Sequence, residues 1–193
     1  MLKEVISELS EDLSKEISKL DKHVEIKYID KGEFEIQLKF SGDTLIFHMH
    51  TNTFSFDKSH QIWKSSYVKE DEYRAYCGVI NIYNFLSDSF KYNRINDLGF
   101  MIGRLYINKE KHFFTEGNGR MSFLYNNFQN DILDKKVLKN IVNELMLYAM
   151  DDELISPPLK EVQVVSLNQI NQMSQNMKLK TAKKLGFKFS NEK

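Results

Sequence analysis

The 193-residue chain has a single cysteine, Cys77, and only two prolines, which stand together as Pro157-Pro158. One cysteine cannot form a disulfide within the chain, and it excludes a metal site built from several thiolates of one chain. Such sparse cysteine usage is typical of proteins from a reducing compartment, so we predict a cytoplasmic location.

No long apolar run is present, and neither sign of charge predominates. A membrane-spanning helix needs about 18 consecutive apolar residues, which this sequence lacks, so we expect no membrane association. The N-terminal segment "MLKEVISELSEDLSKEISKL" carries charges throughout and lacks the apolar centre of a signal peptide. The 27 Lys and Arg residues balance the 27 Asp and Glu residues, which removes any overall attraction to nucleic acid.

The motifs of the common enzyme classes are absent as well. There is no GxSxG, no phosphate-binding P-loop, no GxGxxG after a strand, no HExxH and no CxxC. Because no acid–base or nucleophile constellation is recognisable, we predict a protein without a cofactor that binds rather than catalyses.

The first pattern that is present is helical. Over residues 2–20, apolar side chains recur at gaps of three and four, which predicts an amphipathic helix with one apolar stripe. The stripe consists of Leu2, Val5, Ile6, Leu9, Leu13, Ile17 and Leu20.

The apolar period changes to two over residues 24–57, which predicts a four-stranded antiparallel meander. A two-residue turn at Gly42-Asp43 pairs Leu38 with Phe47 and keeps the apolar residues on one face. A second two-residue turn, at Thr51-Asn52, would pair the third strand with a fourth.

A three-residue loop, Lys31-Gly32-Glu33, completes the predicted meander. It pairs Tyr28 with Ile36 and again places the apolar side chains together. The opposite face of the sheet, which carries His48 and His50, is then expected to meet water.

The rest of the chain alternates between the two periods. The patterns predict a buried helix over 69–92, a hairpin of strands 99–107 and 111–116, a helix over 135–150, a strand over 161–165 and a helix over 167–185. Asp134 and Ser166 precede the last two helices as N-caps.

These elements predict an α+β fold: an N-terminal helix, a four-stranded antiparallel meander, a helix, a β-hairpin, and C-terminal helices packed on one sheet face. The diproline suggests a boundary between a domain over 1–156 and a C-terminal arm over 157–193, made of a short strand and a basic helix.

The polar face of the predicted sheet carries one candidate metal site. Glu35, His48 and His50 lie close enough in the predicted register to bind one Zn²⁺, with water in the fourth position. The simpler interpretation is that all three are polar residues on a solvent-facing surface.

The segment "EGNGR" suggests an anion-binding loop. Amides of Gly117 and Gly119 could form a concave anion site that Arg120 completes, and Arg104 offers a further cation for a nucleotide. The alternative is an ordinary turn, because Asn-Gly between apolar runs is a turn signal.

Lysines gather in the C-terminal segment "NMKLKTAKKLGFKFSNEK". Lys178, Lys180, Lys183 and Lys184 could hold nucleic-acid phosphates without sequence preference. The alternative is a docked helix whose lysines point into water.

Two aromatic residues in the polar stretch after the meander, Trp63 and Tyr67, are candidates for contact with a protein partner. For Trp63, a place in the core is the competing interpretation.

The predicted order of helix, meander, helix, hairpin and helix over residues 1–150 resembles the type III secretion chaperone-like fold. The resemblance implies a binding protein, commonly dimeric, with apolar grooves for an extended segment of its partner. The main functional hypothesis is therefore a chaperone-like adaptor for a protein partner or a homodimer. A nucleic-acid or nucleotide binder and a metal-dependent enzyme are the alternatives.

Overall fold

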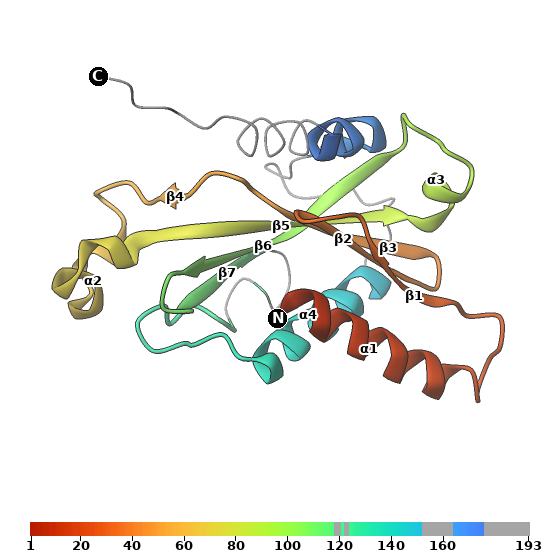
Figure 1. Cartoon of the computed structure of the whole chain (residues 1–193), viewed down its shortest axis with the longest axis horizontal. Helices are drawn as coiled ribbons and strands as arrows, with labels where there is room; N and C mark the ends of the chain where they lie inside the picture. The colour runs from red at the N-terminus through yellow and green to blue at the C-terminus, as the bar shows by residue number, and fades with distance from the viewer. Residues whose placement is uncertain (118–120, 122–123, 152–163, 176–193) are drawn as a thin grey trace, which may run out of the picture.

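The computed structural model describes residues 1–117, 121, 124–151 and 164–175 (Figure 1). Helices pack on both faces of an eight-stranded sheet, which confirms the predicted α+β class with its N-terminal helix, antiparallel strands and C-terminal helices. The helices and strands are α1 (Leu2–Ile17), β1 (Ile26–Asp30), β2 (Glu35–Phe40), β3 (Asp43–Met49), β4 (Phe54–Ser55), η1 (Gln61–Lys64), α2 (Ser66–Glu70), η2 (Glu72–Ala75), β5 (Tyr76–Leu86), α3 (Ser87–Lys91), β6 (Leu98–Asn108), β7 (Phe113–Gly117), α4 (Lys135–Asp151) and β8 (Val164–Ser166).

The sheet runs in the order β1-β2-β3-β5-β6-β7, and every pairing is antiparallel. The meander therefore has three strands, and the prediction of a fourth strand paired with β3 is wrong. β4 pairs with β5 instead, with Phe54 opposite Cys77. The reason is that the much longer β5 takes the whole edge of β3, from Asp43 to Met49.

The predicted registers of β1 with β2 and of β2 with β3 are each wrong by two residues. The β2–β3 turn consists of Ser41-Gly42, with Ser41 at φ 49°, so Leu38 opposes Leu45 rather than Phe47. In the same way Tyr28 opposes Leu38 rather than Ile36, across a longer loop. Because side chains alternate with a period of two, a two-residue shift leaves every residue on its predicted face.

The helix predicted over 69–92 is wrong for most of that range, where β5 forms the centre of the sheet. A central strand is buried on both faces, so its apolar residues form a nearly continuous run that resembles a buried helix. The acidic residues before it start a short 3₁₀ helix: Asp71 accepts a hydrogen bond from the Tyr73 amide at 2.9 Å.

The hairpin of β6 and β7 and the helix α4 confirm the predictions made for them. Asp134 caps α4 through the Val137 amide at 2.7 Å. Residues 167–175 are helical, and Ser166 caps them: its Oγ accepts from the Gln169 amide at 3.2 Å, while Gln169 accepts from the Ser166 amide at 2.7 Å.

The predicted boundary at Pro157-Pro158 lies outside the described residues. Beyond it, β8 pairs with β6, with Val165 opposite Gly99, so this part of the predicted arm belongs to the same sheet. Among the described residues, no helix is long and apolar enough to cross a membrane.

The two faces of the sheet are covered differently (Figure 1). α1 and α4 cover one side, which we call the helical face, and residues 167–175 lie on the other side. The helical face buries one large apolar cluster, which includes Ile6, Leu38, Leu45 and Leu145. The other side, which we call the split face, carries two separate clusters.

The two clusters of the split face lie toward opposite ends of the long strands. One packs around Phe56, Val79, Tyr106, Phe114 and Phe128, beside η1 and α2. We call it the aromatic cluster. The second packs residues of 165–170 on other side chains of the sheet, namely Ile46, Tyr83 and Phe85. We call it the terminal cluster.

Candidate functional site

A line of polar side chains crosses the split face from strand to strand. Glu35 opposes His48, His48 opposes Asn81, Asn81 opposes Arg104, and Arg104 opposes Glu116. We call these five residues the polar row. Since neighbouring strands lie about 4.8 Å apart, the row extends roughly 19 Å across β2, β3, β5, β6 and β7.

The polar row separates the two apolar clusters. On β5, Asn81 of the row stands between the clusters. Val79, two residues before it, belongs to the aromatic cluster, and Tyr83, two residues after it, belongs to the terminal cluster. Side chains two apart on a strand share a face, so the row is a polar interruption of an otherwise apolar surface. An uninterrupted core would be expected there if the face served stability alone.

The charged members of the row have partners within the chain. Glu35 accepts a hydrogen bond from Gln37 Nε2 at 2.9 Å and another from the Ser174 hydroxyl. Arg104 Nη1 lies 3.6 Å from Glu116 Oε2, and this oxygen also accepts from the Tyr106 hydroxyl at 2.8 Å. Burial and the neighbouring Glu116 raise the pKa of Tyr106 to about 12, so it stays a neutral donor.

His48 is the exception in the row. Its side chain is 2% exposed, and its Nε2 has no hydrogen-bond partner in the described part of the chain. Burial lowers the pKa of His48, which outweighs the opposite effect of Glu35, so the imidazole is neutral at pH 7. Leaving such a buried nitrogen unpaired costs about 1–3 kcal/mol of folding free energy.

A cavity of about 640 Å³ opens beside His48 at the middle of the row, and we call it the central cavity. Strands β5 and β6 and the segment 50–54 supply most of its walls, His48 lines it from β3, and Met173 reaches it from the helix over 167–175. Its polar lining includes His48, His50, Asn81, Tyr83, Arg104 and Tyr106.

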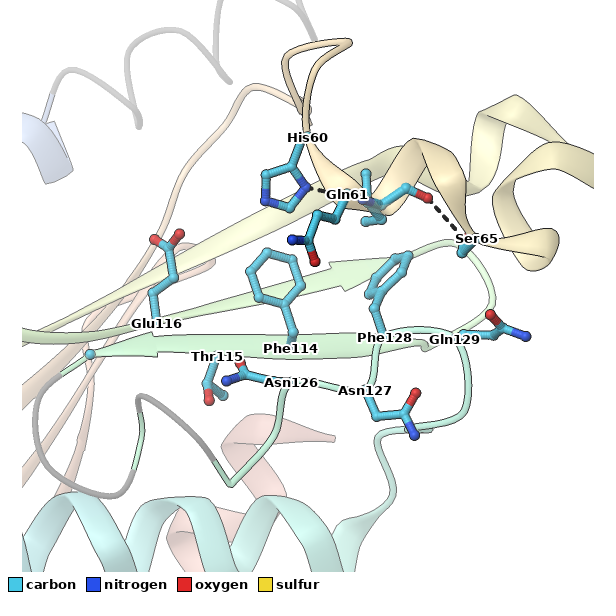
Figure 2. Close-up of a pocket in the computed structure, with 12 residues that line it drawn as sticks. His60, Gln61, Ser65, Phe114, Thr115, Glu116, Asn126, Asn127, Phe128 and Gln129 are labelled. Atoms are coloured by element: carbon cyan, nitrogen blue, oxygen red, sulfur yellow. Dashed lines mark hydrogen bonds between the residues drawn. The ribbon is translucent and has the colours of Figure 1, made fainter.

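A second cavity, of about 700 Å³, lies at the β7 end of the row, and we call it the edge cavity. Figure 2 shows Phe114 and Phe128 side by side beneath His60 and Gln61, with Glu116 beside them. The two phenyl rings meet edge to face at 5.8 Å between centroids. Glu116 therefore lines the edge cavity while it pairs with Arg104 of the central cavity.

The predicted metal site is not formed. Glu35 faces His48 rather than His50, and both Glu35 and His48 are buried instead of meeting water. His50 is exposed beyond the end of β3. Among the described residues, no three His, Cys, Asp or Glu side chains gather closely enough to hold a metal ion.

Trp63 and Tyr67 pack against the aromatic cluster. Trp63 Nε1 donates to the Phe56 carbonyl at 3.2 Å, and the Tyr67 ring stacks on His112 at 4.2 Å. The Tyr67 hydroxyl also donates to Glu110 at 2.8 Å. These contacts favour a packing role, so contact with a partner stays a prediction for both residues.

Of the predicted anion loop, the described residues include only Gly117, at the end of β7. A Cβ there would lie 2.6 Å from the Ile102 carbonyl oxygen, so close backbone packing explains this glycine. Gly119 and Arg120 lie outside the described residues, as do the predicted nucleic-acid contacts Lys178, Lys180, Lys183 and Lys184. Arg104 lies in the polar row.

Sequence reasoning missed two members of the row, Asn81 and Glu116. Asn81 carried a usable signal, because it is a polar residue inside the apolar run Val79, Ile80, Ile82. That signal required the segment to be assigned as a strand, whose alternation would have placed Asn81 beside Tyr83.

Comparisons of the chain with protein-family models, with curated proteins and with solved structures found no match.

Proposed function

We propose that the chain is a non-catalytic binding module that holds an extended segment of a protein partner along the polar row. The observation that carries this proposal is the row itself, which interrupts the apolar surface of the split face and borders a cavity at its centre and another at its edge. An extended chain advances about 3.3 Å per residue, so the part of the row from Asn81 to Glu116, roughly 10 Å long, accommodates about three residues.

The lining of both cavities supports a peptide as the occupant. Side-chain amides and hydroxyls can pair with a peptide backbone, whereas the rings of Phe54, Tyr106, Phe114 and Phe128 offer apolar contact to side chains. Aromatic side chains of this kind contribute strongly to protein–protein binding.

Several contacts support a binding role over catalysis. The Glu35 carboxylate is engaged by Gln37 and Ser174, and the polar row contains no serine, threonine or cysteine nucleophile. Cys77 is buried in the aromatic cluster, where burial raises the pKa of its thiol to about 12 and suppresses the reactive thiolate.

The resemblance to the chaperone-like fold depended on a helix over 69–92, most of which is strand. Only the general role, the capture of an extended segment, is kept from it, and the polar row with its two cavities supports that role. An adaptor role, a homodimer and a cytoplasmic location remain predictions. The pairing of Arg104 with Glu116 disfavours a phosphate-bearing ligand at this row.

A peptide selection tests the proposal. A random peptide library is selected on the whole protein, and each enriched peptide is then measured on Asn81→Trp and on Asn140→Trp. Asn81 lines the central cavity, whereas Asn140 is exposed on α4. We expect binding to weaken at least roughly tenfold in Asn81→Trp and to stay unchanged in Asn140→Trp.

Circular dichroism checks that both variants keep the fold. No enrichment of any peptide, or peptides that bind Asn81→Trp as tightly as the original protein, would overturn the proposal.

A further inference from the structure

The edge cavity joins an apolar floor to a carboxylate. Phe114 and Phe128 form the floor, and Figure 2 shows His60 and Gln61 over the two phenyl rings. Glu116 lies beside them, because side chains two apart on β7 share a face of the sheet. The cavity therefore matches a long side chain with an apolar stem and a polar head.

One oxygen of Glu116 takes all the contacts that this side chain makes in the described part of the chain. The Tyr106 hydroxyl donates to Oε2 at 2.8 Å, and Arg104 Nη1 lies 3.6 Å from the same oxygen. The Arg104 distance exceeds that of an ordinary hydrogen bond, so this ion pair does not use up the acceptor capacity of the carboxylate.

The second oxygen, Glu116 Oε1, can be reached from solvent. It accepts from no group among the described residues, and the Glu116 side chain is 52% exposed. A ligand in the edge cavity can therefore donate to Oε1 without displacing Arg104 or Tyr106.

The charge of the lining favours a positive ligand. Among the described residues that line the edge cavity, Glu116 is the one acidic side chain, and there is no lysine or arginine. Arg104 lines the central cavity instead. The exposed Gln61 adds a side-chain carbonyl, which is a further acceptor for N–H donors. Hydrogen bonds between a cation and a carboxylate are about twice as strong as those between neutral groups.

We propose that the edge cavity binds an arginine side chain, whose guanidinium group donates to Glu116 Oε1. The apolar stem of the arginine packs on Phe114 and Phe128, and Gln61 offers the guanidinium group a second acceptor. Resting on the proposed function, this arginine belongs to the bound segment of the partner. A guanidinium group suits the site better than an ammonium group does, because it is planar, carries several N–H donors and is more weakly hydrated.

The test compares two small probes of nearly equal size, N-acetylarginine N-methylamide and its uncharged citrulline counterpart. The whole protein, with ¹⁵N-labelled histidine, is titrated with each probe while the ring-nitrogen resonances are followed by NMR. We expect the arginine probe to shift the His60 resonances saturably, with an affinity roughly tenfold above that of the citrulline probe. The exposed His23 lies outside the cavity and should respond equally little to both.

Two variants complete the test. Glu116→Gln removes the charge but keeps a carbonyl that can accept from Tyr106, and it should weaken binding of the arginine probe roughly tenfold. Glu33→Gln, at an exposed position outside the cavity, should leave the binding unchanged. Circular dichroism checks that both variants keep the fold.

Three results would each overturn the proposal. They are a citrulline probe that binds as tightly as the arginine probe, His60 resonances that respond to neither probe, and an arginine affinity that Glu116→Gln leaves unchanged.

The outcome is separable from that of the peptide selection. Peptides that bind at the row together with unresponsive His60 resonances would remove the arginine site and keep the binding module. A saturable arginine response that depends on Glu116, without any row-dependent peptide, would keep the arginine site and remove the protein segment as its source.

Discussion

The two faces of one sheet have been filled in different ways. On the helical face, α1 and α4 close a single apolar cluster whose members include the fully buried Leu38 and Leu45. On the split face, the same strands carry two smaller clusters with the polar row between them. The difference indicates that the helical face supplies stability, whereas the split face gives up apolar contact to keep polar groups beside a cavity.

Leu45 and Ile46 offer the largest test of this comparison, because they are adjacent, fully buried and on opposite faces. We expect Leu45→Ala to lower the free energy of unfolding by about 3–5 kcal/mol, since the large cluster cannot collapse around the void. Ile46→Ala should cost about 2–3 kcal/mol, because its cluster borders the central cavity and can relax. Urea denaturation measures both, and a larger loss for Ile46→Ala would contradict the comparison.

The next largest loss of stability is expected at the edge of the sheet, where the backbone of β7 lies close to that of β6. We expect Gly117→Ala to destabilise the fold by about 1–3 kcal/mol, since the added methyl group would meet the Ile102 carbonyl oxygen at 2.6 Å. Gly42→Ala is the matched control, because no atom lies within 4 Å of a Cβ at that turn position. Thermal unfolding of the two variants should separate them clearly, and equal melting temperatures would show that β7 moves freely.

The smallest expected change in the free energy of unfolding is an increase, and it concerns His48 in the polar row. His48→Leu should raise the free energy of unfolding by about 1 kcal/mol at pH 7, because it removes an unpaired buried nitrogen. His50→Leu, at an exposed position, should leave stability nearly unchanged.

The gain from His48→Leu should grow below pH 6.5. The pKa of His48 is lowered from 6.5 in the fold, so in this range the unfolded chain binds a proton that the folded chain does not. The original protein therefore loses stability as the pH falls through that window, and the variant lacks this contribution. Urea denaturation at several pH values checks it, and a stability difference that does not change with pH would contradict the assignment.

Local patterns were sufficient for the fold where one face of an element is apolar and the other is polar. The stripe of α1 and the capped helix α4 are such elements, and so are the faces of β2 and β3. Register was not predictable in the same way, because it depends on the turn. The prediction placed Gly42 first in the turn, because glycine adopts a positive φ most readily, but Ser41 takes the positive φ, and the turn lies one residue earlier than Gly42-Asp43.

The candidate site was only half predictable for a related reason. Glu35 and His48 were correctly placed on one polar face, but the two-residue register error joined Glu35 to His50. The expectation that this face meets water failed because residues 167–175 pack over part of it, a long-range contact without a local signal. Asn81 was lost when its strand was predicted as a helix.

The packing of α1 against α4 has a consequence for the order in which the protein is made. Glu4 and Asp12 pair with Lys135 and Lys139, so the two helices that close the helical face come from distant parts of the chain. Synthesis proceeds from the N-terminus, and α1 therefore leaves the ribosome long before its partner exists. Until α4 has been translated, the nascent chain exposes the apolar residues that α4 covers in the folded protein. A transcript that ends before α4 would therefore yield a product prone to aggregation.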